Sequence, residues 1–465
     1  MQRLESHIDQ PGQFAKVAAR LGTVLLLCWL AGCGKGVAPV TQTAPTTTGP
    51  QTYFAPYVTG VTGSTTPLTY TIDDVAGTFS QTTYQPQTQP GPQVLNAGVL
   101  TVGQRGLRSL GITATYTFDS GASPTAYQVT PYPKPGLPGS FAVELASQAG
   151  GLVQMVGQPV QPLVAATQCP NSSAQTYQFV TIPTAQWDPI TDTAYGSVEI
   201  ASSGSDVTFQ QIQQYILPPA GGTGASPQHP AQPSTSSVHG ACGPTFFGNI
   251  TNVPGQLVVT DPGIGTSLPA QAQIGIGSSG LLVENNGYPA VMAGTSPAID
   301  YENVLGAGNG AVGLPKPSSS LDASAVAGAQ YLGFIYEAGA SSPAVTWSSN
   351  LVSFGFSSVP TDCPSAKASS TTPLIYGGDF DPASSKDGFG KCDFVIDLGV
   401  PQDSSNSLYT QAKVWVGESY PGYSAAITYP FPAVAIAGQL GGKYAIFLIG
   451  LDSVQPWAIY LLQSN

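Results

Sequence analysis

The densest group of side chains that could bind a metal or take part in catalysis is acidic. Asp379, Asp381 and Asp387 follow one another closely in a segment that also contains glycine. Carboxylate oxygens in such a loop are the ligands that Ca²⁺ prefers. The spacing departs from that of an EF-hand loop, because Ser384 and Gly390 stand where that loop needs its glycine and its bidentate glutamate. Two interpretations stay open, a weak calcium site and a solvated turn.

Hydrolytic chemistry has few candidates. The sequence contains no Gly-x-Ser-x-Gly, and its Gly-x-Gly-x-x-Gly matches lack the strand–turn–helix context that phosphate binding needs. Glycoside hydrolysis requires two carboxylates across a cleft, and the pattern does not show which acids converge. The candidates for such a pair include Asp73, Asp74, Glu337 and Glu418.

The beginning of the chain has the pattern of an export signal. A weakly basic start with Arg3, Lys16 and Arg20 precedes a short apolar run that ends in Leu-Ala-Gly-Cys33. The run is too short for a bilayer span, which needs about 20 residues. Leu-Ala-Gly-Cys resembles the lipobox of bacterial lipoproteins. The resemblance implies cleavage before Cys33, acylation of Cys33 and, because Gly34 rather than Asp follows, an outer-membrane destination.

Four further cysteines lie beyond the leader, and an even number in an exported chain predicts two disulfides. The absence of a Cys-x-x-Cys pair argues against a metal site. Three pairings are possible. Closure between nearest neighbours is preferred because it links each half of the chain separately, which gives Cys169–Cys242 and Cys363–Cys392.

Composition favours a globular β protein and restricts its partners. Hydrophobic residues make up 42% of the 465 residues, and 55 Gly and 42 Pro suit short strands joined by many turns. Only 8% of residues are charged, and removal of residues 1–32 leaves 10 basic against 23 acidic residues, a net charge of −13. This sparse negative charge argues against nucleic acid as a partner.

Strand patterns dominate the folded part, because β-branched and aromatic residues alternate with polar ones between turn signals. Such pairs of runs around Gly, Ser or Asn predict hairpins. Four are predicted, namely 194–200 with 207–209, 273–276 with 281–284, 345–347 with 351–356 around a turn at 348–350, and 433–436 with 443–449.

Helical signals are limited to 142–148 and 321–327, and neither carries a long amphipathic stripe. Three runs, 177–182, 331–336 and 444–449, each begin with Tyr and continue with apolar residues. The similarity of these three runs fits either a duplicated β unit, as in two small barrels, or the ordinary composition of strands.

Composition shifts divide the chain into five segments. If Cys169 pairs with Cys242, the fourth segment would be a tethered loop rather than a linker, so one large β unit or two domains both stay open. The segments are a signal peptide (1–32), lipidated Cys33 with a Thr/Pro-rich tether (33–52), a β domain (53–220), a Pro/Ser/Gly-rich loop or linker (221–241) and a second β domain (242–465).

The predicted fold is mainly β, with one or two antiparallel barrels or sandwiches, few short helices and two disulfides. Tyr420, Tyr423 and Tyr429 could stack on sugars or pack over a barrel end. We therefore expect a lipid-anchored, non-catalytic envelope protein without a cofactor, which binds a glycan, a small apolar ligand or another envelope protein. The alternative is a hydrolase of envelope or environmental polysaccharide. An apolar cavity inside a closed barrel would indicate that the protein binds a small ligand. A filled core would indicate that it works through its surface.

Overall fold

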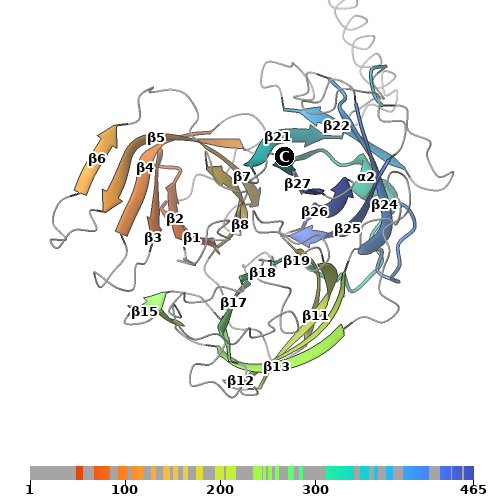
Figure 1. Cartoon of the computed structure of the whole chain (residues 1–465), viewed down its shortest axis with the longest axis horizontal. Helices are drawn as coiled ribbons and strands as arrows, with labels where there is room; N and C mark the ends of the chain where they lie inside the picture. The colour runs from red at the N-terminus through yellow and green to blue at the C-terminus, as the bar shows by residue number, and fades with distance from the viewer. Residues whose placement is uncertain are drawn as a thin grey trace, which may run out of the picture. The chain divides into compact units, whose positions relative to one another are not determined.

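The computed structural model is almost entirely antiparallel strands, which confirms the predicted β-barrel fold (Figure 1). Across the described part of the chain, no helix is long and apolar enough to cross a membrane. The structure describes residues 49–55, 68–83, 93–102, 107–118, 127–131, 140–146, 150–155, 161–165, 174–181, 194–203, 206–215, 234–242, 245–247, 250–253, 257–260, 271–276, 282–285, 311–339, 346–355, 361–364, 373–380, 391–417, 430–440, 442–452 and 455–464.

Nine strands form the first sheet, in the order β4-β3-β2-β1-β9-β8-β7-β5-β6. Because β5 pairs with both β4 and β7, eight strands close into a ring that we call the N-terminal ring, and β6 pairs with the end of β5. The strands are β1 (Gln51–Ala55), β2 (Leu68–Asp73), β3 (Thr78–Thr83), β4 (Gln93–Val102), β5 (Leu107–Phe118), β6 (Tyr127–Pro131), β7 (Ser140–Ala146), β8 (Gly150–Met155) and β9 (Gln161–Ala165).

The next strands close into a second unit, the middle barrel, in the order β10-β11-β12-β13-β16-β17-β18-β19. β14 (Thr245–Phe247) and β15 (Ile250–Val253) form a separate two-stranded ribbon. The barrel strands are β10 (Gln175–Thr181), β11 (Ala194–Ser203), β12 (Asp206–Tyr215), β13 (Ser234–Cys242), β16 (Leu257–Thr260), β17 (Gln271–Ile276), β18 (Leu282–Asn285) and β19 (Ala311–Pro315).

The last eight strands close in simple sequence order as the C-terminal barrel. A connector, residues 316–330, precedes it and contains helix α2 (Ala323–Gly328). The strands are β20 (Tyr331–Gly339), β21 (Thr346–Phe354), β22 (Leu374–Asp379), β23 (Phe394–Asp397), β24 (Leu408–Val416), β25 (Phe431–Leu440), β26 (Lys443–Asp452) and β27 (Gln455–Gln463).

The three units close in the same way. The first strand of each unit carries a buried tyrosine, which follows Gln-Thr in two units and Gln in the third. In every unit this tyrosine pairs with the last residue of that unit's last strand. In two units the next residue donates its N–H back across the seam at 2.8 Å, from Lys316 to Thr176 O and from Ser464 to Gln330 O. This shared register indicates three tandem versions of one eight-stranded plan. The closing pairs are Tyr53–Ala165, Tyr177–Pro315 and Tyr331–Gln463.

The middle barrel corrects the expected division of the chain. β13 runs through the second half of the segment 221–241 that the sequence predicts to be a loop or linker, and it pairs with β12 and β16. Strands from both sides of this segment belong to one closed barrel, so the expected boundary between β domains does not fall there. Short Ser and Thr side chains conceal the strand from a hydropathy pattern, although Thr235 and Val238 suit it.

The local predictions had mixed outcomes. The hairpins at 194–209, 273–284 and 433–449 are confirmed as β11–β12, β17–β18 and β25–β26. The helix predicted at 321–327 is confirmed as α2, whose N-cap Asp322 accepts from the N–H groups of Ser324 and Ala325.

Two local predictions are wrong. The described part of the helix predicted at 142–148, residues 142–146, is instead part of β7, where Phe141, Val143 and Leu145 alternate with the period of a strand. The turn at 348–350 lies inside β21, because those residues pair without interruption with 335–337 of β20. Backbone pairing thus overrides a Ser-Ser-Asn turn signal there.

The interior of the C-terminal barrel is filled with side chains. Alternate residues of every strand point inward, and the connector closes one end with Leu321, Val326 and Ala327. Burial of this contiguous core is the main stabilising term of the barrel. The largest interior side chains are Tyr331, Phe354, Phe394, Tyr409 and Trp457.

Glycines make room for several of these rings. Phe354 lies over Gly377, its direct cross-strand partner, where a Cβ would come within 2.3 Å of the ring. Trp457 covers its partner Gly450 in the same manner. A ring that covers a neighbouring glycine restores the packing that the missing side chain would have provided.

Candidate functional site

The disulfide Cys363–Cys392 is confirmed, with a Cα–Cα distance of 4.7 Å. It joins the segment before β22 to Cys392, which lies two positions before the start of β23. Asp362 Oδ2 accepts a hydrogen bond from the Cys392 N–H at 3.3 Å, so the crosslink is also held by its neighbour in the sequence. This part of the C-terminal barrel is therefore fixed at the edge of its shortest strands, β22 and β23.

Asp379, a member of the predicted calcium site, lies beside Asp393. Its N–H donates to Asp393 Oδ2 at 3.5 Å, and its own Oδ1 is buried without a hydrogen-bond partner. Burial raises the pKa of Asp379, and the charge of Asp393 raises it further. Asp381 and Asp387 lie outside the described residues, within which no group of three or more His, Cys, Asp or Glu side chains could hold a metal ion.

The acids considered for glycoside hydrolysis are engaged in structural contacts where they are described. Asp73 Oδ1 accepts from the N–H groups of Val75 and Ala76, both at 2.9 Å, and so shapes the β2–β3 turn. Asp74 forms a two-pronged ion pair with Arg108, whose Nε lies 2.7 Å from Oδ1. Both side chains of this pair are about 95% buried, with relative exposures of 5% and 6%.

The two other candidates belong elsewhere. Glu337 is a residue of β20 in the C-terminal barrel, and its side chain lies outside the described part, as does all of Glu418. Among the described side chains, Asp73 and Asp74 are engaged in separate structural contacts and do not form a pair across a cleft.

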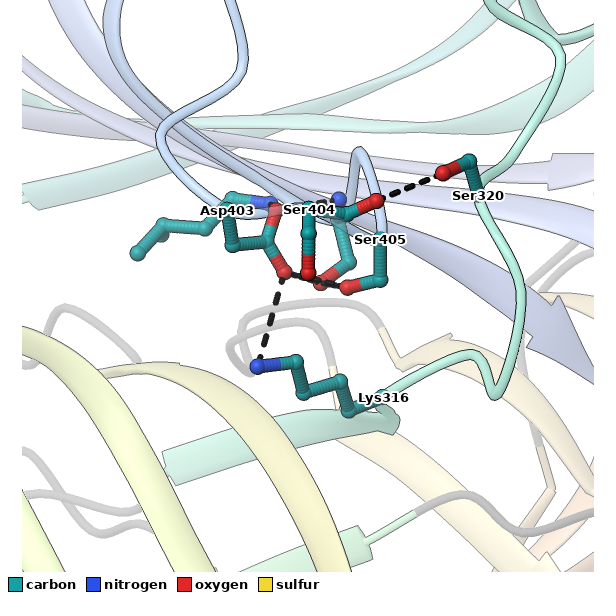
Figure 2. A network of polar contacts seen from close by, with 7 residues as sticks. Lys316, Ser320, Asp403, Ser404 and Ser405 are labelled. Atoms are coloured by element: carbon teal, nitrogen blue, oxygen red, sulfur yellow. Dashed lines mark hydrogen bonds and ion pairs between the residues drawn. The ribbon is translucent and has the colours of Figure 1, made fainter.

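A polar network at the end of the C-terminal barrel was missed by the sequence analysis (Figure 2). Asp403 lies at its centre and accepts from both the Ser405 and the Ser407 hydroxyls and from the N–H groups of Ser407 and Leu408. Burial alone would raise the pKa of Asp403, but these hydrogen bonds outweigh it and lower the pKa. The run Asp-Ser-Ser-Asn-Ser is a turn signal that could have located the network.

Buried tyrosines are a further group of polar side chains in the C-terminal barrel. Tyr331 donates its hydroxyl to Val326 O of α2 at 2.5 Å. Burial raises the pKa of Tyr409 to about 12, and the nearby Asp403 adds to this shift. The hydroxyls of Tyr409 and Tyr460 have no hydrogen-bond partner. These phenols stay protonated at neutral pH and contribute chiefly by packing.

Other predicted site residues fall outside the described part of the chain. They are Cys33, Cys169, Tyr420, Tyr423 and Tyr429, together with the side chain of Cys242, whose backbone ends β13. The second disulfide, the lipid attachment and the tyrosine platform consequently stay predictions.

Comparisons with known proteins give no family. No protein-family model and no curated protein matches the chain. Among solved structures, two variants of the vaccine antigen transferrin-binding protein B from Haemophilus parasuis Hp5 are 6% and 7% identical, each over 90% of this chain and 76% and 77% of theirs, both with a TM-score of 0.21. Intact Ap-TbpB, with its N and C lobes, is 7% identical over 89% of this chain and 76% of its own, with a TM-score of 0.20. Similarity at this level carries no conclusion about function.

Proposed function

We propose that this chain is a lipid-anchored protein of the bacterial outer membrane that works through its surface as a non-catalytic binding or structural module. The observation that carries the proposal is the filled interior of the C-terminal barrel. A barrel that serves as a container for a small ligand needs a cavity, whereas this one is packed with aromatic and aliphatic side chains. The filled interior therefore argues against a small apolar ligand inside this barrel, and a glycan or an envelope protein is the favoured partner.

The carboxylates support the same interpretation. Asp73, Asp322 and Asp397 accept hydrogen bonds from nearby backbone N–H groups, Asp74 pairs with Arg108, and Asp403 holds a turn together. Carboxylates that are already engaged by structural partners are poorly placed for proton transfer to a substrate.

Anchoring rests on Cys33 and is tested separately. Cells that express the chain are labelled with an alkyne analogue of palmitate, with and without globomycin, and the Cys33→Ser variant is the control. We expect label in the wild-type chain alone and accumulation of the precursor with globomycin. A Cys33→Ser chain that is still labelled would contradict the anchor, and protease treatment of intact cells shows on which side of the membrane the folded part lies.

The surface role is tested against the hydrolase alternative. The purified chain without its leader is mixed with peptidoglycan sacculi and with soluble polysaccharides, and both co-sedimentation and the release of reducing ends are measured. Binding without release supports the proposal, whereas release of fragments would overturn it. Asp379, with its raised pKa beside Asp393, is the residue whose Asp379→Asn variant would then be examined first.

A further inference from the structure

The connector 316–330 is bound to both flanking barrels from its first residue. The N–H of Lys316 donates to Thr176 O of β10 at 2.8 Å, which ties it to the middle barrel. Its Nζ lies 3.9 Å from Asp403 Oδ2, in the polar network of the C-terminal barrel (Figure 2). One residue thus contacts both barrels, directly after the end of β19.

The next part of the connector lies along the same network. Ser320 Oγ donates to Ser404 O at 2.5 Å, and the Leu321 N–H donates to Ser405 O at 3.0 Å. Asn406 Nδ2 returns a hydrogen bond to Leu321 O at 2.8 Å. Helix α2 then closes the barrel end, so the connector is held at its first residue and again from Ser320 onward.

The two barrels also share a continuous apolar core. Val434, Ile436, Phe447 and Ile449 face outward from β25 and β26, yet they are fully buried. Their outward neighbours are side chains of the middle barrel, which belong to the same cluster. These are Val180, Tyr195, Val312 and Leu314.

A glycine marks the closest approach. At Gly438, on the outward face of β25, an added Cβ would lie 3.0 Å from Leu314 Cβ and 3.4 Å from Pro315 O. Contacts between β19 and β25 lie in the same place. Because packed cores tolerate little added volume, a larger residue at this position would push the barrels apart.

We infer that the middle and C-terminal barrels form one rigid two-barrel body, joined through the apolar seam at Leu314 and Gly438 and fastened by Lys316. This inference is independent of the proposed function, because it concerns how two units of the chain are held and not what they bind. Any partner of the chain would then meet a fixed surface that spans both barrels rather than two independent modules.

The test measures the distance between the barrels in the whole chain without its leader. A ketone-bearing non-natural amino acid is placed at the exposed positions Glu199 and Lys413 and carries spin labels, so that the native cysteines are left alone. Pulsed electron resonance should give one narrow distance distribution. In Gly438→Leu the distribution should broaden and shift to longer distances, while Gln439→Leu, an exposed neighbour, should match the wild type.

Two results would overturn the inference. One is a broad distribution in the wild-type chain, and the other is a narrow, unshifted distribution in a folded Gly438→Leu chain. If Gly438→Leu does not fold, Leu314→Ala combined with Lys316→Ala removes contacts without adding volume and should broaden the distribution in the same direction.

Discussion

The N-terminal ring and the C-terminal barrel have the same closure, but the described core of the ring combines buried apolar residues such as Leu110 with buried polar pairs. In the N-terminal ring, Arg108 and Gln81 are buried with their partners Asp74 and Tyr70, and the Gln81 Nε2–Tyr70 Oη distance is 2.7 Å. In the C-terminal barrel, the described interior is apolar and aromatic, and Tyr409 keeps an unpartnered hydroxyl. The shared register therefore does not depend on one kind of core, since hairpin pairing and strand alternation are common to both.

The largest effect is expected from breaking the buried ion pair. Asp74→Ala leaves the Arg108 guanidinium in the ring without its main carboxylate, which should destabilise the N-terminal ring by about 3–5 kcal/mol. Urea unfolding combined with hydrogen exchange of peptides from β2 and β5 measures the loss. The double variant Asp74→Ala/Arg108→Met should recover part of it, and a loss below about 1 kcal/mol in Asp74→Ala would show that the pair is not buried.

A glycine substitution should have the next largest effect, in the C-terminal barrel. Gly377→Ala places a Cβ against the Phe354 ring and should destabilise the barrel by about 1–3 kcal/mol through overpacking. Gly328→Ala at the end of α2 is the matched control, because nothing lies within 4 Å of its Cβ. Thermal unfolding of both variants measures the difference, and equal melting temperatures would contradict the packing of the Phe354 ring over Gly377.

A matched pair of Tyr→Phe variants sharpens the comparison of the two interiors. Tyr70→Phe removes an acceptor for Gln81 and should cost about 1–2 kcal/mol. Tyr409→Phe removes a hydroxyl without a partner and should be neutral or slightly stabilising. If both variants lose similar stability in denaturant titrations, the hydrogen-bonded hydroxyl of Tyr70 contributes no more to stability than the unpartnered hydroxyl of Tyr409.

The smallest effect concerns Asp379 and depends on pH. Its pKa is raised in the folded state, so the folded barrel favours the protonated form and loses stability as the pH rises through that pKa. Asp379→Asn should therefore be more stable than the wild type at pH 7, and the difference should vanish below about pH 4. For Asp403, whose pKa is lowered, Asp403→Asn should show the opposite sign, with a deficit at pH 7 that shrinks on acidification.

Local features of the fold could be predicted from the sequence, and long-range ones could not. Alternation and turn residues located the β11–β12 and β25–β26 hairpins, and the preference for closure between nearest neighbours predicted the Cys363–Cys392 pair. Ring closure depends on strands that are far apart in the chain, such as β10 with β19, and no local pattern reports it.

The same limit applies to the candidate site. Arg108 and Asp74 are separated by 34 positions, and the β2–β3, β3–β4 and β4–β5 pairings make them neighbours. Asp403 offered a turn signal, but its link to Lys316 requires both barrels to be folded. Asp379 was singled out for its acidic neighbours in sequence, whereas its partner in space is Asp393.

The pairing of first and last strands has a consequence for how such a chain could have grown. A unit whose two termini lie side by side can be copied, excised or reinserted as one genetic block, because the cut leaves neighbouring strands of other units untouched. The tyrosine that follows Gln-Thr or Gln at the first strand of each unit would then be a trace of the ancestral block, and the differences between the interiors would record what each copy has accumulated since.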